Sequence, residues 1–304
     1  MEDKIVIFER AKQPAPRMLS IDQIVDPESE WEKVAEVYGH IEGMNFDRQG
    51  RMWMVSTPKG QIIRIDDGKP VVVGPSEDAP NGMAFHKDGR LFVADKVGKI
   101  YWADPESGER HLIADRYKNG HFSGLNDCCF DTRGGFYFTE PYGTSTTNPT
   151  GRVFYLPPDG KAEDIVCLME NVAFPNGICC APHDERLFVA EFARNRVLSA
   201  QCVPPANKSE PNYVFCTYTG GVGPDGICVD SDGNLYCAHF GATEVVVCNP
   251  EGFLYGAIRL PEHLGVHSDN LAFHGNYLYV QEGQSNTVWR IRLKTHGPKL
   301  YSDM

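Results

Sequence analysis

The 304-residue chain contains no run of about 18 consecutive apolar residues, the length that a membrane-spanning helix needs. Basic residues are also scarce: 29 Lys and Arg stand against 41 Asp and Glu, and the formal net charge is -12. Nucleic acids and anionic membrane surfaces both attract clustered positive charge, so neither is expected as a partner. The N-terminal stretch MEDKIVIFERAKQPAPR is a poor signal peptide because it lacks a long apolar segment and a small-residue cleavage site. A cytoplasmic location is therefore predicted.

Several chemical motifs are missing as well. None of the ten cysteines has CxxC or another metal-ligand spacing. There is no GxSxG nucleophile elbow and no HExxH motif, and the glycine-rich segments lack the lysine of a phosphate-binding loop. Six cysteines fall inside apolar runs, where a free thiol packs as a small hydrophobic group: Cys128, Cys129, Cys179, Cys180, Cys228 and Cys237. Helical periodicity is absent, which favours an all-β fold.

One pattern is present six times. Each copy opens with a side chain that carries an oxygen, and two alternating apolar runs follow with a turn between them, as in PNGMAFHKDGRLFVAD at residues 80–95. The opening residues are Glu42, Asn81, Asn126, Asn176, Asp225 and Asp269. A repeat of about 40 to 50 residues with four short strands per unit is typical of β-propellers. The sequence therefore predicts an all-β, six-bladed β-propeller with four antiparallel strands per blade.

The last blade needs a strand from the other end of the chain. After the sixth hairpin only TVWRIRL at 287–293 reads as a strand, and WEKVAEVYG at 31–39 is expected to supply the missing outer one. The predicted organisation is an N-terminal extension (1–30), a single propeller (31–294) and a C-terminal tail (295–304). The extension and the tail are expected to be poorly ordered, and 141–151 and 202–212 are expected to be long loops.

The opening residues are the strongest functional signal. The innermost strand of each blade lines the channel of a propeller, so all six side chains are expected to meet near its axis. Carboxylate and amide oxygens suit Ca²⁺, Mg²⁺ or Mn²⁺, and neighbouring carboxylates repel one another unless a cation neutralises them. Turn capping or water binding is the alternative. The pattern indicates a metal site with Glu42, Asn176 and Asp225 as its principal ligands.

At this point the sequence resembles the regucalcin, gluconolactonase and luciferin-regenerating-enzyme propellers, most closely the gluconolactonase branch. The matching motifs span residues 40–292: EGMNFD, PNGMAFHKDGRLFVA, LNDCCFDTRGGFYFTEPYG, FPNGI, PDGICVDSDGNLYCA and DNLAF. The resemblance implies one divalent cation, usually Ca²⁺, with Mn²⁺, Mg²⁺ or Zn²⁺ as alternatives. It also implies lactone hydrolysis, with Asn126 as a frequent fourth ligand and Asp225 as the general base.

Two of the matching motifs depart from the family pattern. Gly124 and Leu125 stand where the family usually has Ser-Pro before Asn-Asp, and Asp269 stands where the last blade usually has Thr. Asp269 is therefore expected to add a carboxylate near the channel. These changes affect the expected substrate more than the expected metal site.

Substrate contacts are predicted at the same end of the channel: Asn126, Asn81, His121, Phe122, Tyr142, Phe192, His239, His267 and Asp269. The second strands of the hairpins end there, with Thr57, Lys96, Glu140, Glu191, Phe240 and Glu282 among their last residues. If the aromatic residues face the pocket, they favour a lactone less polar than a sugar lactone. Packing between blades is the other interpretation.

The predicted function is metal-dependent hydrolysis of a small-molecule lactone, with Asp225 activating water, by a monomer or small homo-oligomer. A phosphotriesterase-like hydrolase and a noncatalytic, calcium-stabilised binding module are the alternatives. A strictosidine-synthase-like enzyme is more remote because the metal ligands are intact. Fold alone does not decide among them, since propellers carry many functions.

Overall fold

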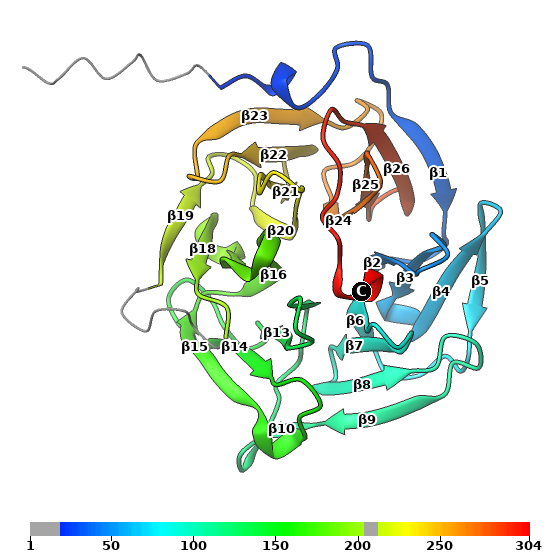
Figure 1. Cartoon of the computed structure of the whole chain (residues 1–304), viewed down its shortest axis with the longest axis vertical. Coiled ribbons are helices and arrows are strands. Elements are labelled where there is room, and N and C mark those ends of the chain that lie inside the picture. Colours follow the sequence, from blue (N-terminus) through cyan, green and yellow to red (C-terminus); the bar gives the residue numbers. More distant parts are fainter. Residues whose placement is uncertain (1–18, 204–211) are drawn as a thin grey trace, which may run out of the picture.

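The computed structural model describes residues 19–203 and 212–304. They form six four-stranded antiparallel sheets arranged as blades around a central channel (Figure 1). The predicted six-bladed propeller is confirmed. In this part of the chain no helix is long and apolar enough to cross a membrane.

The first five blades run in chain order from the channel outward. Blade one contains β2 (Ile41–Phe46), β3 (Met52–Ser56), β4 (Gln61–Asp66) and β5 (Lys69–Val73). Blade two contains β6 (Pro80–Phe85), β7 (Leu91–Asp95), β8 (Lys99–Ala103) and β9 (Arg110–Ala114). Blade three contains β12 (Cys128–Phe130), β13 (Phe136–Glu140), β14 (Gly151–Leu156) and β15 (Val166–Val172). Blade four contains β16 (Pro175–Cys180), β17 (Leu187–Glu191), β18 (Arg196–Ala200) and β19 (Tyr213–Thr217). Blade five contains β20 (Gly223–Val229), β21 (Leu235–Phe240), β22 (Glu244–Cys248) and β23 (Leu254–Arg259).

The sixth blade closes the ring with strands from both ends of the chain. It contains β24 (Ser268–His274), β25 (Tyr277–Glu282) and β26 (Thr287–Arg292), and β1 (Glu32–Glu36) pairs with β26 on the outside. Glu32 lies opposite Arg290 in this register, and their side chains form an ion pair of 2.7 Å. The predicted closure by an N-terminal strand is confirmed, and it removes one open sheet edge.

Short elements connect the strands. The β10–β11 hairpin (Arg116–Tyr117 and Gly120–His121) lies in the loop that enters blade three. The 3₁₀ turns are η1 (Ile21–Gln23), η2 (Thr57–Lys59), η3 (Ala162–Asp164), η4 (Pro182–Asp184), η5 (Phe192–Arg194) and η6 (Tyr301–Asp303). The predicted loop 141–151 connects β13 to β14, which begins at Gly151. Most of the predicted loop 202–212 lies outside the described residues.

An aspartate organises the inner hairpin of several blades. Asp131 accepts hydrogen bonds through Oδ1 from the backbone N–H groups of Arg133 and Gly135, and through Oδ2 from the hydroxyl of Tyr137. Asp230 bonds in the same way to residues two, four and six places later. In blade one the equivalent Asp47 accepts from the indole N–H of Trp53. The turn residue thus fixes both the hairpin and a large buried aromatic side chain.

Six clusters of buried apolar side chains lie between adjacent blades, so the core is divided among the blade interfaces. The C-terminal tail also packs onto the body: Tyr301 and Ser302 are buried, and the Ser302 carbonyl accepts from Nε of Arg48 at 2.7 Å. The expectation of a poorly ordered tail does not hold for these residues. In the N-terminal extension, Ile24 is buried between blades five and six, and residues 1–18 lie outside the described residues.

Candidate active site

The opening residues of the repeats lie where the inner strands depart from regular pairing. The register shifts beside them in five blades: between Glu42 and Asn45, Pro80 and Gly82, Pro175 and Ile178, Pro224 and Ile227, and Ser268 and Asn270. In blade three Asn126 precedes the inner strand, which begins at Cys128. A bulge redirects the side chains next to it. The repeated irregularity therefore aims the opening side chains inward.

These side chains gather at one end of the channel. The inner strands contact one another around the ring, and the opening residues are only 1 to 8% exposed: Glu42, Asn81, Asn126, Asn176, Asp225 and Asp269. Glycine follows the opening residue in four blades and permits this approach. At Gly226, for example, an added Cβ would lie 2.7 Å from Oδ1 of Asn270 in the next blade. The opening side chains are therefore buried on inner strands that contact one another around the channel.

The carboxylates of this cluster repel one another, and the ammonium of Lys96 offsets their charge only in part. Burial raises the pKa of Asp225 well above its usual value, and repulsion from Glu42 adds to the effect, whereas Lys96 and a hydrogen bond with Asn176 oppose it. Burial, followed by repulsion from Glu42 and Asp225, raises the pKa of Asp269 to about 10. Three acidic side chains from three blades thus act on one another in a buried site. A bound cation would relieve the repulsion.

The donor set fits a hard divalent cation. Glu42 and Asp225 offer carboxylate oxygens, and Asn176 and Asn126 offer amide oxygens, which are the ligands that Ca²⁺ prefers. The amide of Asn176 counteracts the rise in the pKa of Asp225, so these two side chains lie close to each other. Glu42, Asn176, Asp225 and Asn126 are the residues that would hold the ion.

Lys96 and Tyr142 form a second part of the site. The Lys96 ammonium lies 5.9 Å from the centre of the Tyr142 ring. Burial acts to lower the pKa of Lys96, but Tyr142, Glu42 and Asp225 raise it overall, so this lysine stays charged. Burial raises the pKa of Tyr142, and Asn126 is among the neighbouring groups that counteract this rise. The sequence marked Lys96 only as a strand end; its proximity to the carboxylates comes from the loop between β7 and β8.

Gly124 makes room for this arrangement. A Cβ at Gly124 would lie 2.6 Å from Cδ2 of Tyr142 and 2.7 Å from the carbonyl oxygen of Lys96. Its φ of 139° is also one that favours glycine. The departure from the Ser-Pro pattern of the family therefore has a structural consequence, because it lets the tyrosine ring pack against the backbone before Asn126.

Aromatic rings form a continuous arc over blades three to six. Tyr142 contacts Phe174, Phe174 contacts Phe192, and Phe192 contacts Phe240, with ring centroids 6.0, 5.4 and 5.8 Å apart. Phe240 then stacks on His267 at 4.3 Å. All five side chains are half-buried, and all lie on loops or strand ends at the end of the channel that holds the carboxylates. We refer to these residues as the aromatic arc.

Phe174 is a member of the arc that the sequence did not single out. It lies in the motif FPNGI, directly before the strand that carries Asn176, and its φ is 60°. A bulky side chain rarely adopts this left-handed conformation, and such strain is common at functional sites. The unusual backbone places the ring between Tyr142 and Phe192.

Other predicted contact residues occupy different positions. Asn81 uses its amide between blades, since Nδ2 donates to the carbonyl of Asn126 at 3.0 Å and Oδ1 accepts from Thr57 at 3.1 Å. Phe122 is buried against Phe138 and Phe154, which is the packing role that the sequence left open. His239 is also buried, with Nε2 3.1 Å from Oδ1 of Asn195. His121 is exposed on the β10–β11 hairpin, and its Nδ1 lies 3.4 Å from Asp115.

The glutamates at the ends of the second strands support loops. Glu140 bonds to the backbone and hydroxyl of Ser123 and pairs with Arg152. Glu191 accepts from the backbone N–H of Ala173 and pairs with Arg194 and Arg196. Glu282 accepts backbone N–H groups from His267, Gln284 and Ser285. Their bonding explains why these buried carboxylates are tolerated.

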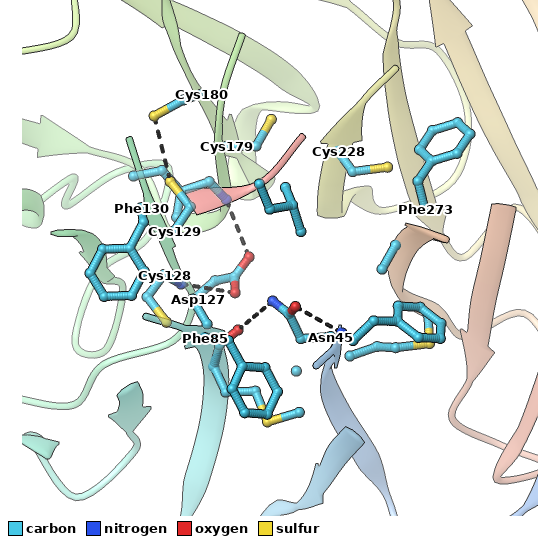
Figure 2. Close-up of a pocket in the computed structure, with 18 of the residues that line it drawn as sticks. Asn45, Phe85, Asp127, Cys128, Cys129, Phe130, Cys179, Cys180, Cys228 and Phe273 are labelled. Atoms are coloured by element: carbon cyan, nitrogen blue, oxygen red, sulfur yellow. Dashed lines mark hydrogen bonds between the residues drawn. The ribbon is translucent and has the colours of Figure 1, made fainter. Parts of the chain in front are cut away.

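A separate cavity of about 140 Å³ lies at the other end of the channel, where the C-terminal tail covers it. Figure 2 shows its lining, which includes Asp127, Asn45 and several cysteines. Asp127 accepts from the backbone N–H groups of Cys128 and Ile178, and burial raises its pKa to about 7. All ten cysteines are free thiols, and Cys129, Cys180 and Cys228 face this cavity. Because its lining is mostly apolar and the tail covers it, we place the candidate active site at the carboxylate end.

Comparison with known proteins agrees with this architecture. Residues 40–282 match the family described as SMP-30/Gluconolactonase/LRE-like region. The chain belongs to this family. It is 33% identical over 245 residues to lactonase drp35 of Staphylococcus aureus, covering 76% of this chain and 73% of that protein. The lactonase drp35 of Staphylococcus epidermidis is also 33% identical, over 247 residues, with the same coverage.

Solved structures of this family share the fold. A gluconolactonase from Xanthomonas campestris superposes with a TM-score of 0.77 at 21% identity, covering 90% of this chain and 92% of the other. A luciferin-regenerating enzyme gives a TM-score of 0.75 at 18% identity, covering 90% and 98%. A calcium-binding regucalcin from Agrobacterium tumefaciens gives 0.71 at 19% identity, covering 86% and 93%. At these identities the likeness concerns the propeller itself.

Proposed function

We propose that this member of the SMP-30/gluconolactonase family is a cation-dependent lactonase that opens its substrate by addition of water. The observation that carries the proposal is the convergence of Glu42, Asn176 and Asp225 in a buried, electrostatically strained cluster. The similarity to lactonase drp35 supports the reaction class.

Glu42, Asn176, Asp225 and Asn126 would hold the cation. A divalent cation bound there would polarise the lactone carbonyl and lower the pKa of water. Asp225 would accept a proton from the attacking water as its oxygen bonds to the carbonyl carbon, and would return that proton to the ring oxygen as the bond between this oxygen and the carbonyl carbon breaks. The burial of Asp225 keeps this carboxylate away from competing solvent. Lys96 offsets the negative charge that develops on the carbonyl oxygen, because its ammonium already lies in the field of Glu42 and Asp225.

The aromatic arc bears on the choice of lactone. Sugar lactones are the default substrates implied by the family, and they need polar partners for their hydroxyl groups. The arc instead offers half-buried ring surface beside the carboxylates. Ring faces bind apolar and aromatic groups favourably. We therefore propose a lactone less polar than a sugar lactone, with His267 and Tyr142 as polar groups at the two ends of the arc.

The test is hydrolysis of a lactone panel by purified protein, followed by proton release near neutral pH. Glucono- and xylono-lactones are compared with aromatic lactones, using chelated protein and protein reloaded with Ca²⁺, Mn²⁺, Mg²⁺ or Zn²⁺. Asp225→Asn should lower kcat about 10²- to 10⁴-fold, whereas the exposed control Asp67→Asn should not. Activity must disappear on chelation and return with one metal.

Failure on all lactones by protein that binds a cation would contradict the proposal. Activity on aryl phosphotriesters would then favour the phosphotriesterase alternative, and activity on neither class would favour the binding module. A cytoplasmic location and a monomer or small homo-oligomer remain part of the proposal. Cell fractionation and light scattering test them.

A further inference from the structure

His40 lies between two acidic side chains of the channel. It precedes β2, so it approaches the carboxylates from the loop that joins blade six to blade one. Its Nε2 is 3.4 Å from Oε1 of Glu42, and its Nδ1 is 3.6 Å from Oδ2 of Asp269. One nitrogen and two carboxylate oxygens from these residues lie within 4.8 Å of one another.

Asp269 is a buried carboxylate without a hydrogen bond. It is 1% exposed, and neither Oδ1 nor Oδ2 has a hydrogen-bond partner in the described part of the chain. The separation of 3.6 Å from His40 exceeds the 2.7–3.2 Å range of N–H···O bonds. An unpaired buried carboxylate is costly, so native proteins pair it, protonate it or bind it to a metal. The three glutamates at the strand ends, by contrast, are all bonded to backbone or arginine groups.

Gly283 provides the space in which this carboxylate lies. A Cβ at Gly283 would overlap Oδ2 of Asp269 and would lie 3.0 Å from Nδ1 of His40. Gly283 is not among the glycines with positive φ, so its backbone conformation does not require glycine. The residue is therefore needed for space beside these two donor atoms.

The group is distinct from the cation position described above. Asp225 is not part of the cluster that brings His40, Glu42 and Asp269 within 4.8 Å of one another. The two positions share Glu42. The first extends from it toward Asn176 and Asp225 in blades four and five, and the second extends toward Asp269 in blade six. His40 has a side chain that is 37% exposed, which leaves an entry path from solvent.

We propose that His40, Glu42 and Asp269 form a second cation position, which takes a borderline metal such as Zn²⁺ beside the Ca²⁺-type position of Glu42, Asn176 and Asp225. The imidazole decides the class, because Ca²⁺ prefers oxygen ligands whereas Zn²⁺ binds histidine and carboxylate together. Ligand atoms about 2.0–2.1 Å from a tetrahedral Zn²⁺ lie about 3.4 Å apart. The separation of 3.4 Å between Nε2 of His40 and Oε1 of Glu42 is close to this value. A single ion takes one nitrogen of the imidazole, and one such nitrogen lies within 4.8 Å of a carboxylate oxygen of Glu42 and of Asp269.

The experiment measures Zn²⁺ binding in full-length protein held in millimolar Ca²⁺, by calorimetry and by competition with a chromogenic chelator. Wild-type protein should bind one equivalent of Zn²⁺. His40→Ala, Gly283→Ala and the isosteric Asp269→Asn should each weaken Zn²⁺ at least tenfold. His121→Ala is the matched control, since this exposed histidine also lies beside an aspartate, and its Zn²⁺ affinity should equal that of the wild type. Co²⁺ should give visible bands that His40→Ala removes.

Circular dichroism shows that each variant is folded. Ca²⁺ titration shows that it retains the Ca²⁺-type position of Glu42, Asn176 and Asp225. Asp225→Asn should weaken Ca²⁺ while the Zn²⁺ equivalent persists, which separates this inference from the lactonase proposal. Unchanged Zn²⁺ affinity in folded His40→Ala and Asp269→Asn would overturn it. The proposal would also be overturned if Asp225→Asn no longer bound Zn²⁺ while His40→Ala still did. That result would place the Zn²⁺ in the Ca²⁺-type position.

Discussion

Phe240 stacks on His267 with ring centroids 4.3 Å apart and an angle of 23° between the planes. The pair connects the end of β21 in blade five to the loop that enters blade six. It completes the aromatic arc beside Asp225 and Asp269. The wall of the candidate site is therefore made by loops of different blades.

If the aromatic arc binds the substrate, Phe240→Ala should lower kcat/KM for aromatic lactones and leave kcat/KM for sugar lactones nearly unchanged. We expect kcat/KM to fall about fivefold for an aromatic lactone, since one aromatic contact contributes about 1 kcal/mol, and to change less than twofold for glucono-lactone. Parallel initial-rate measurements on both substrates test this. Tyr38→Ala, which removes an 83% exposed ring, serves as the control. An equal decrease on both lactones would mean that Phe240 only supports the fold.

Lys96→Met should strengthen cation binding while it weakens catalysis. The ammonium lies in the field of Glu42 and Asp225, so its removal leaves the site more negative. We expect Ca²⁺ affinity to rise about three- to tenfold and kcat to fall, whereas Lys96→Arg should stay near wild type in affinity. Calorimetric titration of the chelated proteins measures the first effect. A lower Ca²⁺ affinity in Lys96→Met would contradict the placement of this charge.

Thermal stability should depend on the cation more strongly at high pH. Burial and repulsion raise the pKa of Asp269 to about 10 in the folded chain, against about 3.9 in an unfolded one. The folded state thus binds this proton more tightly than the unfolded state does. The protonated Asp269 therefore contributes fully to the free energy of unfolding below about pH 4, and this contribution is lost as the pH rises toward about 10. A cation favours the ionised form and prevents the loss.

The increase in Tm produced by millimolar Ca²⁺, relative to chelator, should therefore be larger at about pH 8.5 than at about pH 6. Differential scanning calorimetry at the two pH values measures it. In Asp269→Asn the pH dependence of the increase should be smaller. An increase that is the same at both pH values would show that these carboxylates are not linked to the cation.

Glu191→Gln should destabilise the protein without changing its substrate preference. The carboxylate is 1% exposed and holds Arg194, Arg196 and the backbone N–H of Ala173. Removing one partner of a fully buried ion pair costs about 3–5 kcal/mol. The cost should be smaller here because the two arginine side chains are 33 and 27% exposed, but the urea midpoint should still fall. The ratio of kcat/KM values for two lactones should stay constant. A changed ratio would place Glu191 in the substrate site.

The repeats by themselves determined the fold and the identity of the opening residues. Each hairpin is a local structure whose turn aspartate and alternating apolar residues can be read from a few neighbouring positions, as around Asp131 and Asp230. Six such units must close into a ring to cover their edges. Convergence of Glu42, Asn176 and Asp225 follows from that symmetry, and so it could be predicted without coordinates.

Only the tertiary structure decided which loops meet around the site. Lys96 reaches Tyr142 across the blade two–three boundary because Gly124 leaves room, and Phe174 joins the arc through an unusual backbone conformation. The pairing of His40 with Asp269 depends on Gly283 and on the closure of blade six by β1. These contacts join residues from different blades, and their distances depend on loop geometry, which the repeat does not encode.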